Sequence, residues 1–264
     1  MMRVEDLDAG RVRPGLAEAQ LGDLAALGLD WDGPVVRQSE RLEHYAAALD
    51  RLAADGLLYP CYCTRAEIRQ AASAPHGALP EGAYPGTCRE LTARERAQRA
   101  RAGRPPALRL RAGETVVAFT DRLLGAKQAA VDDVVVRRND GVAAYNLAVV
   151  VDDTAQGIGE VVRGADLLET TPRQLHLRAL LGGPGVIHAH VPLVLGPDGQ
   201  RLAKRHGAVT LADRAAAGQS PVAVRAELAA SVGLAARREQ PSLDELLTRF
   251  DPGRLPHEPT VLAA

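Results

Sequence analysis

Three cysteines lie close together in one short segment that is rich in proline and glycine. Cys61, Cys63 and Cys88 fall within 28 residues, in PCYCTRAEI and YPGTCRE, and the chain of 264 residues has no other cysteine. An odd number of thiols argues against a disulfide framework. A segment with so little apolar material to bury is often held together by a metal ion. The spacing predicts a metal-stapled insertion over residues 57–106, and three reduced, buried thiols are the alternative.

Zinc in a tetrahedral site needs a fourth ligand beside three thiolates. His76 lies between Cys63 and Cys88 and is the choice that chemistry alone favours. Tyr84, four residues before Cys88, is the less usual candidate.

Outside this insertion the sequence alternates between helical and extended patterns. Apolar spacing and end signals predict helices over 15–28, 39–56 with Ser39 as N-cap, 92–103, and 170–182 with Thr171 as N-cap. Extended patterns predict strands at 1–6, at 107–112, on both sides of Asp140-Gly141 within 131–153, at 160–166 and from residue 190. We expect residues 57–90 to be mostly loop and the part after Val209 to form short helices. This alternation predicts an α/β fold with a largely parallel sheet.

Composition excludes several classes of protein. The net charge is −1, with 46% hydrophobic and 25% charged residues, which excludes dominant disorder and a globally basic nucleic-acid binder. No apolar run approaches the roughly 18 residues of a membrane helix, and MMRVEDLDAG is no signal peptide. These features predict a cytoplasmic protein, for which we expect a monomer. The chain has only two lysines, Lys127 and Lys204, so each is a candidate for a role that arginine cannot fill.

Several segments in order resemble the catalytic domains of class I glutamyl-tRNA synthetases. They are RVEDLD (3–8), LGLDWDGPVVRQSERLEHY (27–45), PCYCT with AYPGTCR, AAYNLAVVVDD, EVVRGADLLETTPRQ and RLAKRHGAV. The resemblance implies a Rossmann-type core that binds ATP. It divides the chain into a catalytic domain (1–56 and 107–205), the zinc-binding, acceptor-like insertion (57–106) and a helical C-terminal region (206–264). Only 60 residues follow Lys204, too few for a separate anticodon-binding domain.

In its short length the chain resembles one branch of the family. The enzymes of that branch activate glutamate with ATP and transfer it to queuosine in the anticodon of tRNA(Asp). The expected partners are therefore ATP, L-glutamate and queuosine-containing tRNA(Asp). A truncated synthetase that charges a tRNA 3′ end is one alternative. A catalytically inactive RNA-binding remnant is the other.

The resemblance assigns three residues to the glutamate site. Glu5 matches the family's acidic group for the α-ammonium, Tyr145 would bind a substrate carboxylate, and Arg163 can make a bidentate fork to a carboxylate. Each has a plainer alternative: a capping carboxylate for Glu5 and a core tyrosine for Tyr145. For Arg163 it is an ion pair with Asp152, Asp153 or Asp166.

Lys204 matches the lysine of the family's KMSKS loop, with Arg201, Ala203 and Arg205 replacing the motif's Lys, Ser and Ser. The resemblance makes Lys204 the catalytic, ATP-binding cation, because negative charge builds on the departing pyrophosphate, and Mg²⁺ is expected with the ATP. The resemblance also makes Cys61, Cys63, Tyr84 and Cys88 the zinc ligands, with the metal in a structural role.

The family's His-x-Gly-His type motif, which lies upstream of RVEDLD, is not found in this sequence, and His188-Ala189-His190 has the wrong spacing to replace it. We therefore expect an open sheet edge beside the first visible strand. Between Arg89 and Arg111 there are eight arginines, which could contact tRNA phosphates or form a solvated helix face.

Overall fold

The computed structural model describes residues 1–72, 83–202 and 210–261. In chain order the elements are β1 (Met2–Val4), α1 (Leu16–Ala26), β2 (Val35–Arg37), the 3-10 turn η1 (Gln38–Glu40), α2 (Leu42–Ala54), β3 (Leu58–Cys61), α3 (Arg65–Ala72), α4 (Ala93–Arg101), β4 (Ala107–Leu110), β5 (Val116–Asp121), β6 (Gly125–Ala130), β7 (Val135–Arg137), α5 (Tyr145–Ala155), β8 (Glu160–Gly164), η2 (Ala165–Thr170), α6 (Thr171–Leu180), β9 (Ile187–Val191), β10 (Val194–Leu195), α7 (Leu211–Ala216), α8 (Pro221–Ser231), α9 (Leu243–Arg249), η4 (Pro252–Arg254) and β11 (Thr260–Val261). The predicted α/β class is confirmed.

The sheets are mixed, so the expectation of a largely parallel sheet holds only in part. β1 pairs with β2 in parallel, and β9 lies parallel to both β8 and β5. By contrast, β5 and β6 form an antiparallel hairpin, and β3, β4 and β7 form a separate antiparallel sheet. Only β5 and β6 are joined by a short turn, whereas the insertion separates β3 from β4 and the β5–β6 hairpin separates β4 from β7.

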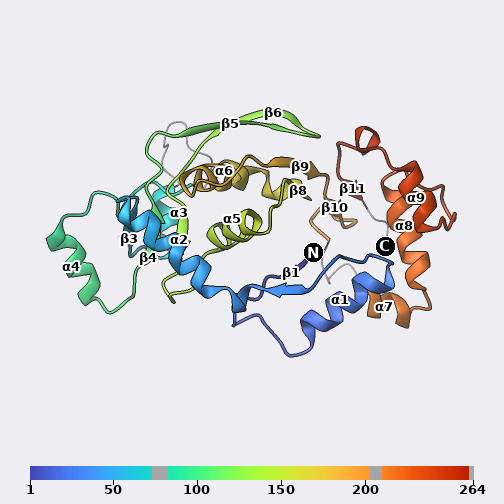
Figure 1. Ribbon diagram of the computed structural model, residues 1–264, viewed down its shortest axis with the longest axis horizontal. Coiled ribbons are helices and arrows are strands. Elements are labelled where there is room, and N and C mark those ends of the chain that lie inside the picture. Colours follow the sequence, from blue (N-terminus) through green and yellow to red (C-terminus); the bar gives the residue numbers. More distant parts are fainter. Residues whose placement is uncertain (73–82, 203–209, 262–264) are drawn as a thin grey trace.

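The main core surrounds α5, which lies between the β1–β2 pair and the β8–β9 layer (Figure 1). Leu147 of α5, Leu52 of α2, Leu177 of α6 and Val136 of β7 are all fully buried. Because α5 is covered from several sides, its residues 147–151 are all apolar, and Asp152 and Asp153 near its end are buried as well.

This burial explains the largest correction to the sequence-based prediction. The run after Asp140-Gly141 was predicted to be a strand, but it forms helix α5, with Tyr145 at its first position. The turn itself is present, with φ of +88° at Gly141 and an antiparallel bridge between Arg137 and Ala143. A continuous apolar run does not distinguish a buried helix from a buried strand.

Smaller corrections concern helix starts and the insertion. Arg41, not Ser39, is the N-cap of α2, and Ser39 instead donates to the carboxylate of Asp6, with Oγ 2.7 Å from Oδ2. The N-cap of α6 is Thr170, one residue before the predicted position. Within residues 57–90, which were expected to be mostly loop, the described part includes strand β3, which pairs with β4, and helix α3.

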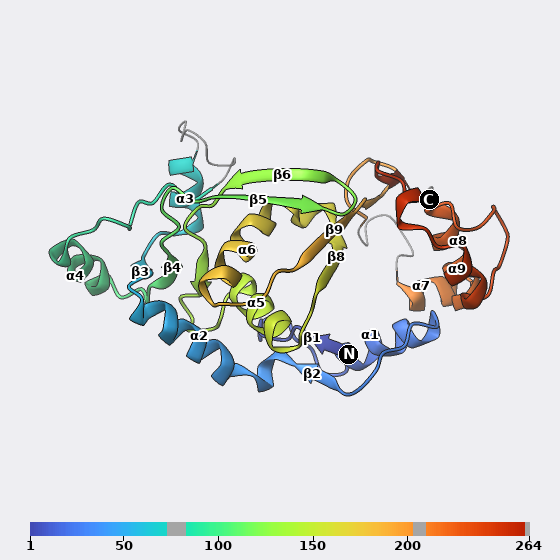
Figure 2. The same cartoon turned by 45° about the horizontal axis from the view of Figure 1, so that its top comes forward.

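The expected open edges are present among the described residues. β8 pairs only with β9, and β1 pairs only with β2. The edges of β8 and β1 face each other across a cavity lined by residues of both strands. Figure 2 shows the two strands on either side of α5.

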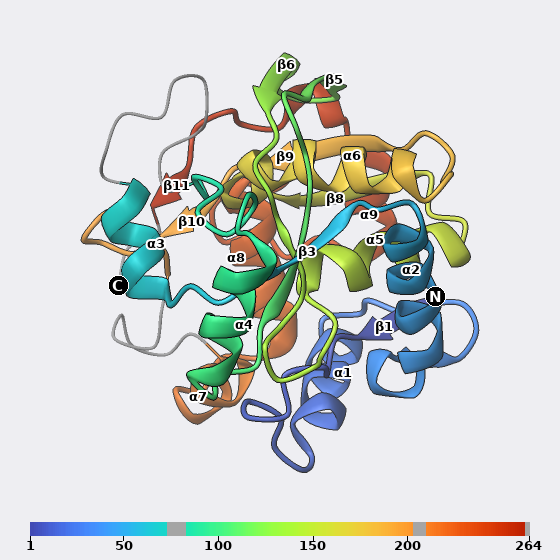
Figure 3. The ribbon, with the colours of Figure 1, turned by 90° about the vertical axis from the view of Figure 1, so that its left-hand side faces the viewer.

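The two ends of the molecule are helical. At one end α4 projects toward the viewer in Figure 3, capped by a reciprocal Thr92–Glu95 hydrogen-bonded box, as the exposed helix over 92–103 predicted. At the other end lie α7, α8 and α9, in agreement with the short helices predicted after Val209. In the described part of the chain, every helix is too short or too polar to cross a membrane.

Candidate functional site

Three of the predicted glutamate-site residues line one cavity. Glu5 follows β1, Tyr145 begins α5, and Arg163 lies near the end of β8, and all three line a cavity of about 320 Å³. Arg3 and Asp153, which the sequence analysis did not single out, line it too. The cavity therefore holds charges of both signs around one phenol.

Arg163 has no carboxylate partner among the described residues, so the alternative of an ion pair with Asp152, Asp153 or Asp166 is wrong. Its Nη1 donates to Gln174 Oε1 (2.6 Å), and its Nη2 to Thr171 Oγ1 (2.7 Å) and, over 3.4 Å, to the carbonyl of Leu167. Its Nε lies 3.1 Å from His190 Nε2.

The surroundings of Arg163 have two consequences. Burial lowers the pKa of its guanidinium from the usual value, and the Tyr145 phenol with the charges of Asp153 and Asp121 offsets this only in part. The guanidinium also interacts with the Tyr145 hydroxyl, and its Nη2 contact with Leu167 is long, at 3.4 Å. A bidentate fork to a carboxylate would replace that long contact.

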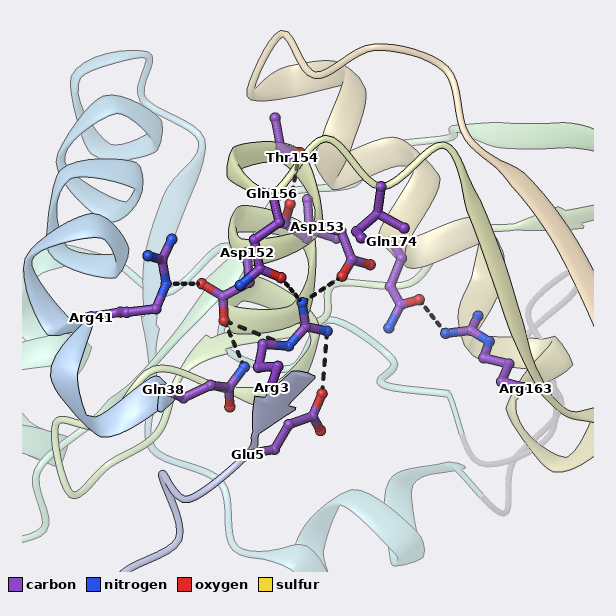
Figure 4. Close-up of polar contacts among 12 residues, drawn as sticks. Arg3, Glu5, Gln38, Arg41, Asp152, Asp153, Thr154, Gln156, Arg163 and Gln174 are labelled. Carbon is purple, nitrogen blue, oxygen red and sulfur yellow. Dashed lines mark hydrogen bonds and ion pairs between the residues drawn. The ribbon is translucent and has the colours of Figure 1, made fainter. Parts of the chain in front are cut away.

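Glu5 lies beside Arg3 at the rim of the cavity. Its side chain is 43% exposed, and its Oε1 is 3.4 Å from Arg3 Nη2 (Figure 4). Arg3 makes its shorter contacts elsewhere, with Nη1 donating over 2.8 Å to both Asp153 and Gln156. The Glu5 carboxylate is therefore weakly held and accessible to a cation.

A buried carboxylate fixes Arg3 from behind. Asp152 is fully buried and accepts from Gln38 Nε2 (2.8 Å), Tyr45 Oη (2.8 Å) and Arg41 Nε (2.7 Å), and it lies 4.0 Å from Arg3 Nε. Figure 4 shows this network joining α2 and η1 to α5. This network fixes one side of the cavity, although Arg3 Nε, Arg41 Nη2 and Gln156 Nε2 are buried without a hydrogen-bond partner.

Tyr145 stands between two cavities. Its residue is 45% exposed, and burial of the ring together with the Glu5 charge raises the pKa of its hydroxyl. The residue also lines a second cavity of about 600 Å³ with Tyr84, Arg104 and Arg173. The alternative of a core tyrosine bonded to backbone does not describe this position.

Lys204 and His76 lie outside the described residues. The start of the loop that carries Lys204 is placed, however, because Arg201 Nη1 is 2.9 Å from Asp166 Oδ2, just after β8. This contact brings the beginning of that loop to the same strand end as Arg163.

The cysteine cluster forms a second, closed site. The sulfur atoms of Cys61, Cys63 and Cys88 lie within 4.8 Å of one another. The Oη of Tyr84 is 3.4 Å from Cys61 Sγ and 3.7 Å from Cys63 Sγ, while the Sγ atoms of Cys63 and Cys88 are 3.5 Å apart. A zinc tetrahedron with three sulfur ligands and one oxygen ligand has edges of roughly 3.5–3.8 Å. The three measured distances are close to these edges, so the four side chains are compatible with a zinc site.

The charge environment of this cluster favours a thiolate. The hydrogen bond with Cys63, with help from Tyr84 and the Arg109 guanidinium, lowers the pKa of Cys61 to about 4. The hydrogen bond with Cys61, together with burial, raises the pKa of Cys63. One thiol is thus ready to bind a cation, and a metal would supply the charge that ionises the others.

Two consecutive aspartates attach this cluster to the main core. Asp133 is fully buried and accepts from Tyr59 Oη (2.5 Å), Arg89 Nε (2.6 Å) and the backbone of Ala112 (2.8 Å). Asp132 accepts from the backbone N–H of Tyr84 (2.9 Å) and from Arg173 of α6. The insertion is therefore bound directly to the helix whose first turn binds Arg163.

The basic stretch divides into paired and unpaired arginines. Arg89 and Arg111 form ion pairs with Asp133 and Glu90. Arg94, Arg101 and Arg104 are exposed and have no carboxylate partner within the described residues.

Comparison with protein families gives one match over nearly the whole chain. The family model described as "tRNA synthetases class I (E and Q), catalytic domain" matches residues 1–258.

Curated relatives agree with this match. The glutamyl-Q tRNA(Asp) synthetase of Nocardia farcinica (strain IFM 10152) is 61% identical over 262 residues, which cover 99% of this chain and 82% of that protein. The glutamyl-Q tRNA(Asp) synthetase of Symbiobacterium thermophilum is 51% identical over 276 residues, covering 100% of this chain and 85% of that protein.

A solved structure shares the fold. A glutamate tRNA ligase from Elizabethkingia meningosepticum, in complex with its amino acid, superimposes with a TM-score of 0.77 at 23% identity. The match covers 98% of this chain and 59% of that one.

Proposed function

The chain belongs to the catalytic-domain family of the class I glutamyl- and glutaminyl-tRNA synthetases, and on this premise we propose that it is a ligase that activates glutamate with ATP and transfers the glutamyl group to queuosine in the anticodon of tRNA(Asp). The names of its curated relatives support the choice of substrate and acceptor.

The observation that carries the proposal is the unpaired Arg163 guanidinium facing a cavity with Glu5 and Tyr145. Glutamate has two carboxylates and one ammonium. Arg163 and the phenol of Tyr145 can donate to a carboxylate, and the accessible Glu5 carboxylate can accept from the ammonium. These complementary charges favour a zwitterionic amino acid that carries an extra carboxylate.

The reaction needs cationic groups around the phosphates. Attack of the glutamate carboxylate on the α-phosphorus forms the adenylate and breaks the bond to pyrophosphate, which leaves with extra negative charge. In our proposal Lys204 supplies the cation there, and Mg²⁺ would accompany ATP. The Arg201–Asp166 contact supports this role, because it starts the Lys204 loop beside β8.

Zinc belongs to the proposal as a structural ion. Cys61, Cys63, Tyr84 and Cys88 would hold it, and the fit of their ligand atoms to a zinc tetrahedron is the support. Zinc binding would stabilise the folded insertion, because this segment buries few apolar groups of its own.

The exposed arginines of α4, with Arg104 just after it, are the proposed RNA contact. Arg94, Arg101 and Arg104 lie free of carboxylates in the described structure, and Arg104 also lines the cavity that reaches Tyr145. An RNA strand lying on α4 would have its phosphates near these charges and a nucleotide near the activated glutamate.

Two assays test the function. Glutamate-dependent exchange of pyrophosphate into ATP should be observed, and labelled glutamate should be transferred to tRNA(Asp) that contains queuosine but not to tRNA(Asp) that lacks it. Label on the 3′ end would instead support the truncated glutamyl-tRNA synthetase. RNA binding without either activity would support the inactive remnant.

A further inference from the structure

A buried histidine and aspartate lie directly behind Arg163. His190 is the residue of β9 that pairs with Arg163 of β8 in the parallel register. Its Nδ1 lies 2.6 Å from Asp121 Oδ2, and its Nε2 lies 3.1 Å from Arg163 Nε and 3.2 Å from Thr171 Oγ1, a hydroxyl that can donate to it. Asp121 is 1% exposed and His190 is completely buried. The three side chains form a line from β5 through β9 to β8.

The contacts determine where the imidazole proton lies. A guanidinium Nε has one hydrogen and no lone pair, so it can only donate. The Nε2 of His190 must therefore accept, and its proton must be on Nδ1, where the Asp121 carboxylate accepts it. His190 is thus neutral and polarised by a carboxylate on the far side of the ring.

The imidazole orients the Arg163 guanidinium without placing a negative charge next to it. A carboxylate in direct contact with Arg163 would orient the guanidinium but would also compete with a substrate carboxylate. The neutral imidazole provides an acceptor of fixed direction and keeps the Asp121 charge on the far side of the ring. Together with Gln174 and Thr171, it binds the inner side of the guanidinium. The outer hydrogens remain for a ligand.

We propose that His190 and Asp121 are positioning residues that hold the Arg163 guanidinium, without neutralising it, in the orientation that binds the glutamate carboxylate. This inference rests on the proposed glutamate site. It adds two residues from β5 and β9 that do not line the cavity.

Two isosteric substitutions separate this role from a purely structural one. The amide oxygen of His190→Gln can replace Nε2 as acceptor for Arg163, while the contact to Asp121 is lost. The amide nitrogen of His190→Asn can replace Nδ1–H toward Asp121, while the acceptor for Arg163 is lost. Glutamate-dependent pyrophosphate exchange should give a KM for glutamate within about 5-fold of wild type for H190Q. H190N should raise the KM for glutamate at least 10-fold. The KM for ATP should be unchanged in both variants.

Equal KM values for glutamate in H190Q and H190N, with active wild type, would overturn the positioning role while leaving the proposed function intact. If wild type shows no glutamate-dependent exchange, the proposed function fails, and the contact itself is tested independently by ¹⁵N NMR of labelled histidine. The expected spectrum has an unprotonated Nε2 for His190 at neutral pH, and a protonated Nε2 would overturn the inference.

Discussion

The cysteine cluster and the proposed glutamate cavity are built in opposite ways. The cluster takes its groups from 28 consecutive residues and buries all of them except Cys63, which is half-buried. The cavity takes Glu5, Tyr145 and Arg163 from three distant elements and leaves them partly open. A local site depends on its own ligands, whereas a distributed site depends on the scaffold that brings its parts together. Substitutions at the cluster should therefore mainly affect stability, and substitutions at the cavity should mainly affect activity.

The largest effect is expected at the cluster. Cys88→Ser should abolish stoichiometric zinc and lower the free energy of unfolding of the metal-loaded protein by several kcal/mol, because structural zinc contributes on the order of 10 kcal/mol in small domains. Metal analysis and thermal unfolding with and without chelator measure this. Tyr62→Phe, beside the ligands, should keep its zinc. A wild-type protein that binds no zinc and melts identically in chelator would contradict the proposed site.

At the cavity, Arg163→Lys should lower kcat/KM for glutamate by roughly 30-fold to several thousand-fold. An ammonium cannot reproduce the planar fork, and losing a desolvated charged hydrogen bond costs about 2–5 kcal/mol. Thermal stability should change little by comparison. Arg122→Lys, whose arginine pairs with Glu160 on the surface at 2.7 Å, is the matched control and should retain activity. Equal activity in both variants would remove Arg163 from the glutamate site.

The scaffold behind the cavity should be acid-sensitive. His188 stacks on His190 with ring centroids 5.9 Å apart, and burial, with the Arg163 charge, lowers the pKa of His188 to about 4. The unfolded chain binds this proton at higher pH than the folded one, so stability is full above about pH 6.5 and falls as pH drops toward 4. The loss in the free energy of unfolding between pH 6.5 and pH 4 should reach up to about 3 kcal/mol.

Urea unfolding at pH 4.5 and 6.5 measures this dependence. His188→Gln should reduce the difference in the free energy of unfolding between pH 4.5 and pH 6.5. His257→Gln, at an exposed position, should leave that difference unchanged. An unchanged difference in the His188 variant would show that another group titrates.

The smallest effect is expected on RNA binding. Arg94→Ala and Arg101→Ala should each weaken binding to tRNA(Asp) a few-fold and reduce the slope of log affinity against log salt by about 1, because each removes one phosphate contact. Filter binding across a KCl series measures both quantities. Arg237→Ala, in the C-terminal region, should leave the slope unchanged.

The same contrast explains what could be predicted from sequence. The cysteines were recognisable because their spacing is local, and residue chemistry alone still preferred His76 as fourth ligand. Tyr84 came from the family resemblance and lies within 3.7 Å of two sulfur atoms. The cavity residues also came from the resemblance, and the structure places Glu5, Tyr145 and Arg163 together.

What sequence could not predict depends on contacts between distant segments. Helix α5 was taken for a strand because a helix buried on several sides loses its polar face. His190 was noticed only as part of an unsuitable motif, since nothing near it in sequence indicates Asp121 or Arg163. The β5–β6 hairpin was not predicted, although VVAFTD has alternating exposure in the structure. A signal for the histidine pair exists only after β5, β8 and β9 are aligned.

The adjacent pair Asp132 and Asp133 has one further consequence. One carboxylate joins the backbone of Tyr84 to α6, and its neighbour joins β3, Arg89 and the chain after β4. Two successive residues thus connect the cysteine-containing insertion to the rest of the molecule. Because of this connection, heating should produce a single cooperative melting transition for both parts, and removing zinc from the proposed metal site should also loosen the proposed glutamate cavity.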